Sequence, residues 1–193
     1  MSSANSDTRS RILDAAWKLL EERDGKVRMA DIAKAAKISR QALYLHFPNR
    51  AELLVAITHH LDAVYDVEAM LAPSRSAQTG VERLELFVTA WANYIPQING
   101  VAQALIAMQD TDAEARQAWA DRTDALRHGC RAVARAIEAD GQLSAAHDAE
   151  SATDLLMMLV GVQNWAYLVE QCGWPQPRFV ETIIATAKQA LLA

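Results

Sequence analysis

The sequence contains few of the residues that interrupt helices, with 7 Gly and 5 Pro among 193 residues. Runs of β-branched residues are also scarce, whereas Ala and Leu are abundant, so helix is the expected conformation throughout the chain. Hydrophobic residues make up 51% of the sequence, which suffices for one substantial core and a smaller appended domain. We therefore predict an all-α fold.

Cysteine and long apolar runs are equally sparse. The 2 cysteines, Cys130 and Cys172, lie far apart and show no metal-ligand spacing, so we expect reduced thiols. The longest apolar run, residues 155–162, is too short to cross a bilayer. Residues 1–11 contain no apolar stretch, which argues against a secretion signal. We expect a soluble, cytoplasmic protein with no membrane partner.

A positive net charge is also missing, because the whole chain carries a formal charge of −5. The charge is unevenly divided. Residues 1–50 hold ten Lys or Arg and six Asp or Glu, a net of +4, whereas residues 51–193 hold nine and eighteen, a net of −9. Because phosphate attraction acts over about 10 Å at ordinary salt, a basic segment on an acidic body is compatible with nucleic-acid binding. We expect two domains, residues 1–50 and residues 51–193.

Two short helices are predicted within the basic segment. The second begins at Ser39, a good N-cap, and should end near Phe47 because Pro48 disfavours helical geometry before it. Asn49 followed by Glu52 resembles a capping box that opens the next helix. The first short helix has an apolar stripe at i, i+3, i+4 and i+7 spacing, formed by Met29, Ile32, Ala33 and Ala36.

The second short helix has one apolar and one polar side. Leu43 and Phe47 lie four residues apart and should face inward. Two helices that meet at a short turn, the second with a polar outer face, form a helix-turn-helix, which presents side chains to a DNA major groove. The outward positions are Arg40, Gln41, Tyr44 and Leu45.

A motif with fixed spacing runs through this segment. Its residues are Ile32-Ala33, Ala36, Ser39, Leu43-Tyr44, His46-Phe47, Arg50 and Leu53. The motif resembles the DNA-binding signature of the TetR family of bacterial transcriptional regulators, in detail over roughly residues 8–55 and elsewhere only in length and helical layout. The resemblance implies a three-helix DNA-binding domain, a larger helical effector-binding and dimerisation domain, and a homodimer. The elements expected along the chain amount to about nine helices in all.

The chain departs from the family pattern at three positions. Lys37 stands where the family usually has Gly, and a non-Gly residue at positive φ costs about 1 kcal/mol, so the turn should be strained or differently shaped. Arg28 replaces a capping Thr, and Ala42 replaces a Thr that commonly contacts phosphate. We expect phosphate contacts to move towards Arg28 and Lys37.

Eight residues are candidates for DNA binding. Arg40 and Gln41 can form bidentate contacts, Arg to guanine and Gln to adenine, although Arg40 could also be a solvated surface charge. The resemblance implies phosphate contacts for Tyr44, His46 and Arg50, with partly buried packing as the alternative for His46. The full set is Arg28, Lys37, Ser39, Arg40, Gln41, Tyr44, His46 and Arg50.

Further helices are expected in the body. The first long helix should start at Asp7 and end at Gly25, a helix over residues 50–71 should join the two domains, and residues 73–80 should form a loop. A helix that starts before Leu84 should break at Pro96. Further helices should cover residues 98–108 and 112–138. Helices over residues 149–172 and 177–191 resemble the family's four-helix dimer interface, or else close the core of a single protomer.

Seven side chains of the body are candidates for an effector cavity. Aromatic and Met side chains on helices of the body could line a site for an apolar or aromatic small molecule, although side chains at helical spacing more often belong to the ordinary core. These candidates are Trp91, Tyr94, Met108, Trp119, Met157, Asn164 and Trp165.

Charged groups in the body allow two readings. The row formed by Arg127, Arg131 and Arg135 could bind an anion, or could be a solvated face balanced by Asp124 and Glu138. The group His59, His60, Asp62 and Asp66 matches no specific ligand pattern, so we expect no metal site and no cofactor.

The resemblance implies a homodimeric repressor that binds a pseudo-palindromic operator and is released by a small-molecule effector. The alternatives are a helical interaction or ligand-sensing module with weakened operator reading, or a helical enzyme. The sequence shows no nucleophile with a suitably spaced base, no phosphate-binding Gly loop and no paired acids on a buried face. We therefore expect that the protein is not an enzyme.

Overall fold

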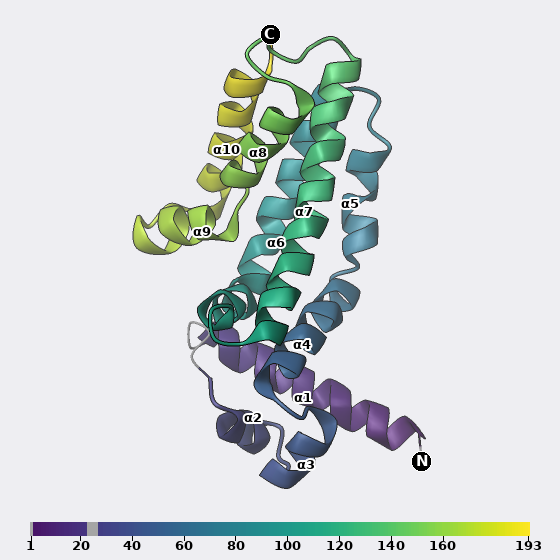
Figure 1. Ribbon diagram of the computed structural model, residues 1–193, viewed down its shortest axis with the longest axis vertical. Helices are drawn as coiled ribbons and strands as arrows, with labels where there is room; N and C mark the ends of the chain where they lie inside the picture. The colour runs from purple at the N-terminus through teal and green to yellow at the C-terminus, as the bar shows by residue number, and fades with distance from the viewer. Residues whose placement is uncertain (1, 23–26) are drawn as a thin grey trace. The chain divides into compact units, whose positions relative to one another are not determined.

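The structure is a computed structural model that describes residues 2–22 and 27–193, and within these ranges it contains helices and no β-strands (Figure 1). The all-α prediction with about nine helices is confirmed, since ten α-helices are present and one of them, α9, is a single turn that continues into the π-helix η1. The helices are α1 Ser2–Glu22, α2 Met29–Ala35, α3 Arg40–His46, α4 Arg50–Val64, α5 Val67–Arg75, α6 Gly80–Met108, α7 Ala113–Ala139, α8 Ala149–Leu159, α9 Val162–Trp165, η1 Ala166–Gln171 and α10 Gln176–Leu191.

The chain forms two compact units. Unit 1 contains Met1–Tyr65 and Gln97–Asp121, and unit 2 contains Asp66–Pro96 and Arg122–Ala193, so that α6 and α7 each contribute to both. The boundary that the sequence suggests after residue 50 separates DNA binding from effector binding. Packing does not test that functional boundary, which stays a prediction.

Unit 1 is organised around α1. Ile12, Ala16 and Leu20 are buried on α1, as the apolar spacing predicts, and α2 and α4 pack against this helix (Figure 1). At Gly100, α6 approaches α1 so closely that a Cβ atom would lie 2.7 Å from the carbonyl carbon of Leu20. A residue without a side chain is therefore needed at this crossing.

Hydrogen bonds fix the same crossing. The indole Nε1–H of Trp17 donates to the Gln97 carbonyl at 3.0 Å, and the Tyr65 hydroxyl donates to Gln97 Oε1 at 2.7 Å. The Gly100 amide donates to Glu21 Oε1 at 3.1 Å. These bonds join α1 and the end of α4 to the second half of α6.

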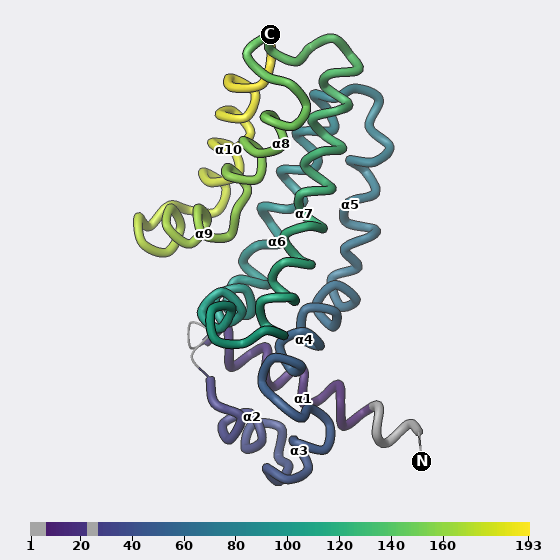
Figure 2. The backbone as a smooth tube through the Cα atoms, viewed as in Figure 1, coloured from purple at the N-terminus to yellow at the C-terminus, as the bar shows by residue number. Residues whose placement is uncertain are grey.

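Unit 2 contains the C-terminal helices. In Figure 2, α8 and α10 run side by side, in agreement with their contacts. Leu156 on α8 and Ile183 and Ala187 on α10 are buried. Asp148 begins α8 with a capping box, in which its carboxylate accepts from the Ser151 amide and the Ser151 hydroxyl accepts from the Asp148 amide.

The helix predicted over residues 50–71 is wrong, because α4 ends at Val64 and α5 begins at Val67. Asp66 has φ 44° and ψ 60°, a left-handed conformation that Asp adopts more easily than most residues. Its carboxylate accepts from the Ala69 amide at 3.2 Å and caps α5. The loop predicted from residue 73 is also wrong at its start, since α5 contains Pro73 and runs to Arg75.

The helix break predicted at Pro96 is wrong as well, because α6 continues to Met108. Proline has no N–H to donate to the carbonyl four residues earlier, which is that of Ala92. The side chain of Gln176 supplies the missing donor, with its Nε2 atom 2.8 Å from the Ala92 oxygen. Gln176 Oε1 in turn accepts from the indole Nε1–H of Trp165 at 2.7 Å.

The predicted helix over residues 149–172 is interrupted. After α8 ends at Leu159, Gly161 adopts an extended conformation and α9 starts at Val162. Two carbonyls near this break accept side-chain hydrogen bonds: that of Val160 from Trp91 Nε1 at 3.0 Å, and that of Met158 from Asn164 Nδ2. One long-range contact, from Trp91, and one local contact, from Asn164, thus satisfy carbonyls that an uninterrupted helix would have paired.

Of the remaining helix boundaries, some agree with the sequence prediction and others differ from it. α7 starts at Ala113 with the Asp112 carboxylate accepting from the amide of Ala115 at 3.0 Å, close to the prediction. Asp7 does not start α1, which already begins at Ser2, and the predicted end at Gly25 lies outside the described residues. None of the helices in the described ranges combines the length and apolarity that a membrane span requires.

The bridging role of Gln176 predicts a non-additive effect on stability. Gln176→Ala leaves the Ala92 carbonyl and the Trp165 indole without their partner, so the free energy of unfolding should fall by about 2–4 kcal/mol. In a Pro96→Ala background residue 96 regains its N–H and can bond Ala92, so Gln176→Ala should cost about half as much. Urea denaturation followed by circular dichroism measures both values.

Gln189→Ala is the matched control, because Gln189 is exposed on the same helix. Its effect should stay within about 0.5 kcal/mol. An equal cost of Gln176→Ala in both backgrounds would show that Gln176 does not replace the donor that Pro96 lacks.

Candidate nucleic-acid interface

The turn between α2 and α3 is a Schellman motif with lysine at the position that usually holds glycine. The Lys37 amide donates to the Lys34 carbonyl at 3.2 Å, and the Ile38 amide donates to the Ala33 carbonyl at 3.0 Å. Lys37 has φ 56°, in the left-handed region. Of the two outcomes expected from the sequence, a strained turn or a different shape, the structure has the strained turn.

Helix α3 has seven residues, and capping side chains lie at its start and at the start of α4, the helix that follows it. Ser39 Oγ accepts from the Ala42 amide at 3.0 Å, so the predicted N-cap is confirmed. After the helix, Asn49 Oδ1 accepts from the Glu52 amide at 2.8 Å and Asn49 Nδ2 donates to Glu52 Oε1 at 3.1 Å. The predicted start of α4 is confirmed in the form of an Asn-Glu cap.

The inner side of α3 is fixed by burial. Leu43 and Phe47 are fully or almost fully buried, as predicted. Arg9 of α1 places its guanidinium carbon 4.9 Å from the centre of the Phe47 ring, and Arg11 Nη2 donates to the Ala36 carbonyl at 3.1 Å. Arg28 occupies the N-cap position of α2, and its side chain makes no capping hydrogen bond. The loss of this cap is expected where Arg replaces a capping Thr.

The DNA-binding candidates gather on α3 and its flanks, apart from Arg28 at the start of α2. Arg28, Lys37, Ser39, Arg40, Gln41 and Tyr44 are exposed. His46 is half-buried, with its ring centre 6.5 Å from that of Phe47. This position is compatible both with packing against Phe47 and with a phosphate contact. Arg50 is half-buried too, and burial lowers the pKa of its guanidinium, which still stays charged at neutral pH.

The sequence alone predicts no role for three residues of this region, Arg9, Arg11 and Leu45. Arg9 and Arg11 belong to the basic first segment, but their packing against α3 and α2 depends on the fold. Leu45 was recognised as outward-facing and is 83% exposed, the highest value among the large hydrophobic side chains in the described ranges. An exposed leucine between polar neighbours was the signal that could have singled it out.

The candidate effector residues belong to different units. Met108 and Trp119 pack against the core of unit 1. The five others lie in unit 2, where the rings of Trp91 and Tyr94 meet edge to face at 5.8 Å. Hydrogen bonds inside the protein use the polar groups of Trp91, Asn164 and Trp165, so a ligand would meet mainly their apolar surfaces.

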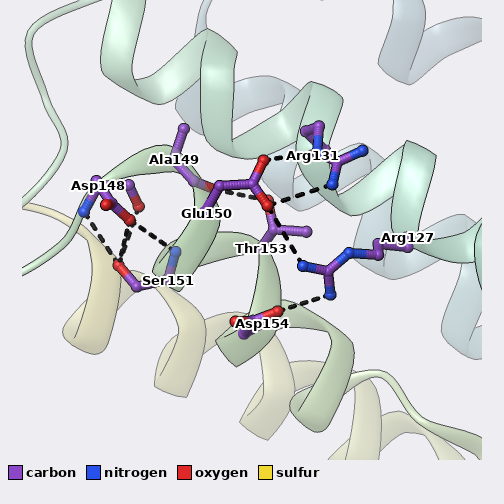
Figure 3. Close-up of polar contacts among 8 residues, drawn as sticks. All are labelled: Arg127, Arg131, Asp148, Ala149, Glu150, Ser151, Thr153 and Asp154. Carbon is purple, nitrogen blue, oxygen red and sulfur yellow. Dashed lines mark hydrogen bonds and ion pairs between the residues drawn. The ribbon is translucent and has the colours of Figure 1, made fainter.

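Arg127 and Arg131, two of the three arginines in the row on α7, are paired with acids on α8 (Figure 3). Arg127 Nη1 lies 2.6 Å from Asp154 Oδ1, and Arg131 Nε lies 2.9 Å from Glu150 Oε1. The hydrogen bond from Arg131 lowers the pKa of the Glu150 carboxyl. These acids, rather than the expected Asp124 and Glu138, balance Arg127 and Arg131, which argues against an open anion site.

The other titratable groups form no centre of their own. His60 Nε2 lies 2.6 Å from Asp14 Oδ1, and across the described residues no three potential ligands are grouped for a metal ion. Both cysteines are free thiols. Cys172 is exposed, whereas burial raises the pKa of the Cys130 thiol to about 12, which makes it a poor nucleophile.

Comparisons with known proteins agree with this architecture. Residues 12–57 match the sequence profile described as bacterial regulatory proteins, tetR family. The HTH-type transcriptional regulator EthR of Mycolicibacterium smegmatis is 27% identical over 189 residues, which cover 93% of this chain and 82% of EthR. The HTH-type transcriptional regulator TtgR of Pseudomonas putida is 34% identical over 79 residues, which cover 40% of this chain but 36% of TtgR.

The fold is shared with a solved structure. A putative transcriptional regulator from Saccharomonospora viridis, crystallised in complex with choline, matches with a TM-score of 0.81 and 19% identity over 97% of this chain and 99% of that chain. At this identity the likeness concerns the fold alone. The helix-turn-helix motif, the profile match and the shared helical fold agree, and residues 12–57 carry the helix-turn-helix domain of the TetR family of bacterial regulatory proteins.

Proposed function

We propose that the protein is a homodimeric transcriptional repressor that binds a pseudo-palindromic operator and is released by a small-molecule effector. The observation that carries this proposal is the outer face of α3, where Arg40, Gln41 and Tyr44 are exposed while Leu43 and Phe47 anchor the opposite side. A short capped helix with this polarity fits a major groove. Residues 1–50 would bind DNA, and residues 51–193 would bind the effector and form the dimer.

The roles of the side chains follow from their chemistry. Arg40 and Gln41 would read base edges through bidentate hydrogen bonds. Lys37, Ser39 and Tyr44 would contact the phosphate backbone, which fixes the register of the helix on the duplex. Arg28, His46 and Arg50 would complete the phosphate contacts at the edges of the interface.

Dimerisation would use α8 and α10. Met158 on α8 and Tyr167 on η1 are each more than half exposed, so the C-terminal region of unit 2 carries apolar surface that a second copy could cover. A two-fold axis would then place two α3 helices in successive major grooves about 34 Å apart.

The effector would be a small apolar or aromatic molecule. The apolar faces of Trp91, Tyr94 and Met157 support this class, and Asn164 and Trp165 belong to the same unit 2. The two other candidates, Met108 and Trp119, belong to unit 1 and pack against its core. The choline bound to the Saccharomonospora viridis protein supports a small organic ligand. Release of DNA requires that the effector bind one arrangement of the protein more tightly than the other.

Selection of bound fragments from random and genomic DNA tests the proposal. A repressor of this kind should enrich one sequence with two inverted half-sites, and the logarithm of its affinity should fall linearly with the logarithm of salt concentration. Binding of helical partners or ligands with no enriched sequence would instead indicate an interaction module, and would refute operator binding.

Arg40→Ala should weaken operator binding by about 1–3 kcal/mol and relax the preference at one base pair of each half-site. The physical reason is the loss of a bidentate contact. Fluorescence anisotropy with operator variants measures the effect. Arg135→Ala, which removes an exposed arginine from α7, is the control. An Arg40 variant with unchanged affinity and preference would identify Arg40 as a solvated surface charge.

Two substitutions at Lys37 separate strain from charge. Lys37→Gly removes the strain of a positive φ, so the free energy of unfolding should rise by about 1 kcal/mol. Lys37→Ala keeps the strain, so stability should change little. Both variants lack the cation, so both should bind the operator more weakly. The slope of the logarithm of affinity against the logarithm of salt concentration should become shallower by about one for each half-site. Unchanged salt dependence would remove Lys37 from the interface.

Met158→Asp should weaken the dimer about tenfold or more, because an unpaired carboxylate is costly in an apolar interface. Sedimentation equilibrium measures the dissociation constant. Val64→Asp is the matched control, since Val64 has a similar exposure of 52% but belongs to α4 in unit 1. A dimer that tolerates Met158→Asp would exclude α8 from the interface.

A further inference from the structure

Leu45 lies at the centre of the exposed face of α3. Successive helical residues are turned by about 100°, so Gln41 and Leu45, two residues before and two residues after the buried Leu43, both point within about 20° of the direction opposite to it. Gln41 is exposed and Leu45 is 83% exposed. The residues that would penetrate deepest into a groove are therefore one amide and one aliphatic side chain.

Burial inside the protein does not explain this leucine. Its neighbours Leu43 and Phe47 form the anchored side of the helix, and the Ser39 cap fixes the start of α3. The surroundings are polar and cationic, with Lys37, Arg40 and Gln41 exposed nearby in sequence. A cationic rim around an apolar tip fits a nucleic acid better than an apolar protein surface.

We infer that Leu45 reads a thymine through contact with its 5-methyl group, and this inference rests on the proposed operator binding. In the major groove the thymine methyl is the one apolar group on a base edge, and apolar side chains recognise it by contact. Leu45 thereby determines sequence preference without a hydrogen bond, beside the amide of Gln41.

The geometry also places the thymine. Gln41 and Leu45 are four residues apart, which is about 6 Å along the helix axis, whereas base pairs in DNA are spaced about 3.4 Å apart. The thymine read by Leu45 therefore lies one or two base pairs from the pair read by Gln41. The half-site should contain adjacent or nearly adjacent A·T pairs.

Deoxyuridine substitution tests the inference, because uracil lacks only the methyl group and keeps the pairing edge of thymine. In the selected operator, each symmetric pair of thymines is replaced in turn by deoxyuridine, and affinity is measured by fluorescence anisotropy. For the wild-type protein one replacement should weaken binding about fourfold per half-site, or about fifteenfold for the dimer. The same replacement should change the affinity of Leu45→Ala less than about twofold.

Three further measurements sharpen the result. Gln41→Ala should relax a base pair one or two positions from the methyl-sensitive thymine. Val64→Ala, which shortens an exposed apolar side chain on α4, should bind both operators as the wild type does. Thermal melting of Leu45→Ala should match the wild type, because the side chain is exposed.

The outcomes distinguish the inference from the function on which it rests. If the wild-type protein enriches an operator but no thymine replacement weakens binding, or if Leu45→Ala still responds to the replacement, the inference is overturned and operator binding stands. If Leu45→Ala alters sedimentation and leaves the response to deoxyuridine intact, Leu45 contacts a second copy instead. If no sequence is enriched, both the proposed function and the inference fail.

Discussion

The whole candidate interface depends on the docking of a helix that is too short to be stable alone. Isolated helices shorter than about 12–15 residues are marginal in water, and α3 has seven residues. Burial of Leu43 and Phe47, the Ser39 cap and the guanidinium of Arg9 over the Phe47 ring hold it in place. The polar side chains on its outer face are therefore oriented by the core of unit 1 rather than by the helix itself.

The features that local sequence controls were predictable. Ser39, Asn49 and Asp112 act as caps because their side chains reach backbone amides two or three residues away, and the apolar spacing of Ile32 and Leu43 identifies the buried side of each short helix. The strained geometry at Lys37 was also one of the expected outcomes, since the turn needs a left-handed residue whichever side chain occupies it.

The features that long-range contacts control were not predictable. Pro96 predicts a helix break because it lacks the N–H that would bond the Ala92 carbonyl. The donor that replaces this N–H is the side chain of Gln176, which is distant in sequence. The apolar sequence after Ala149 predicts one continuous helix, because the Trp91 indole that satisfies the Val160 carbonyl at the interruption comes from a distant part of the chain. The partners of Arg127 and Arg131 lie on another helix, so spacing along α7 could not identify them.

The bond between Gln176 and the Ala92 carbonyl also has a consequence for the order of folding, because it joins residues 84 positions apart. Contacts between such distant residues form late, after the loop between them has closed. During synthesis the middle of α6 must exist without its substitute donor until the C-terminal helix has emerged. Helix α6, which contributes to both units, therefore gains this hydrogen bond only after α10 has been synthesised.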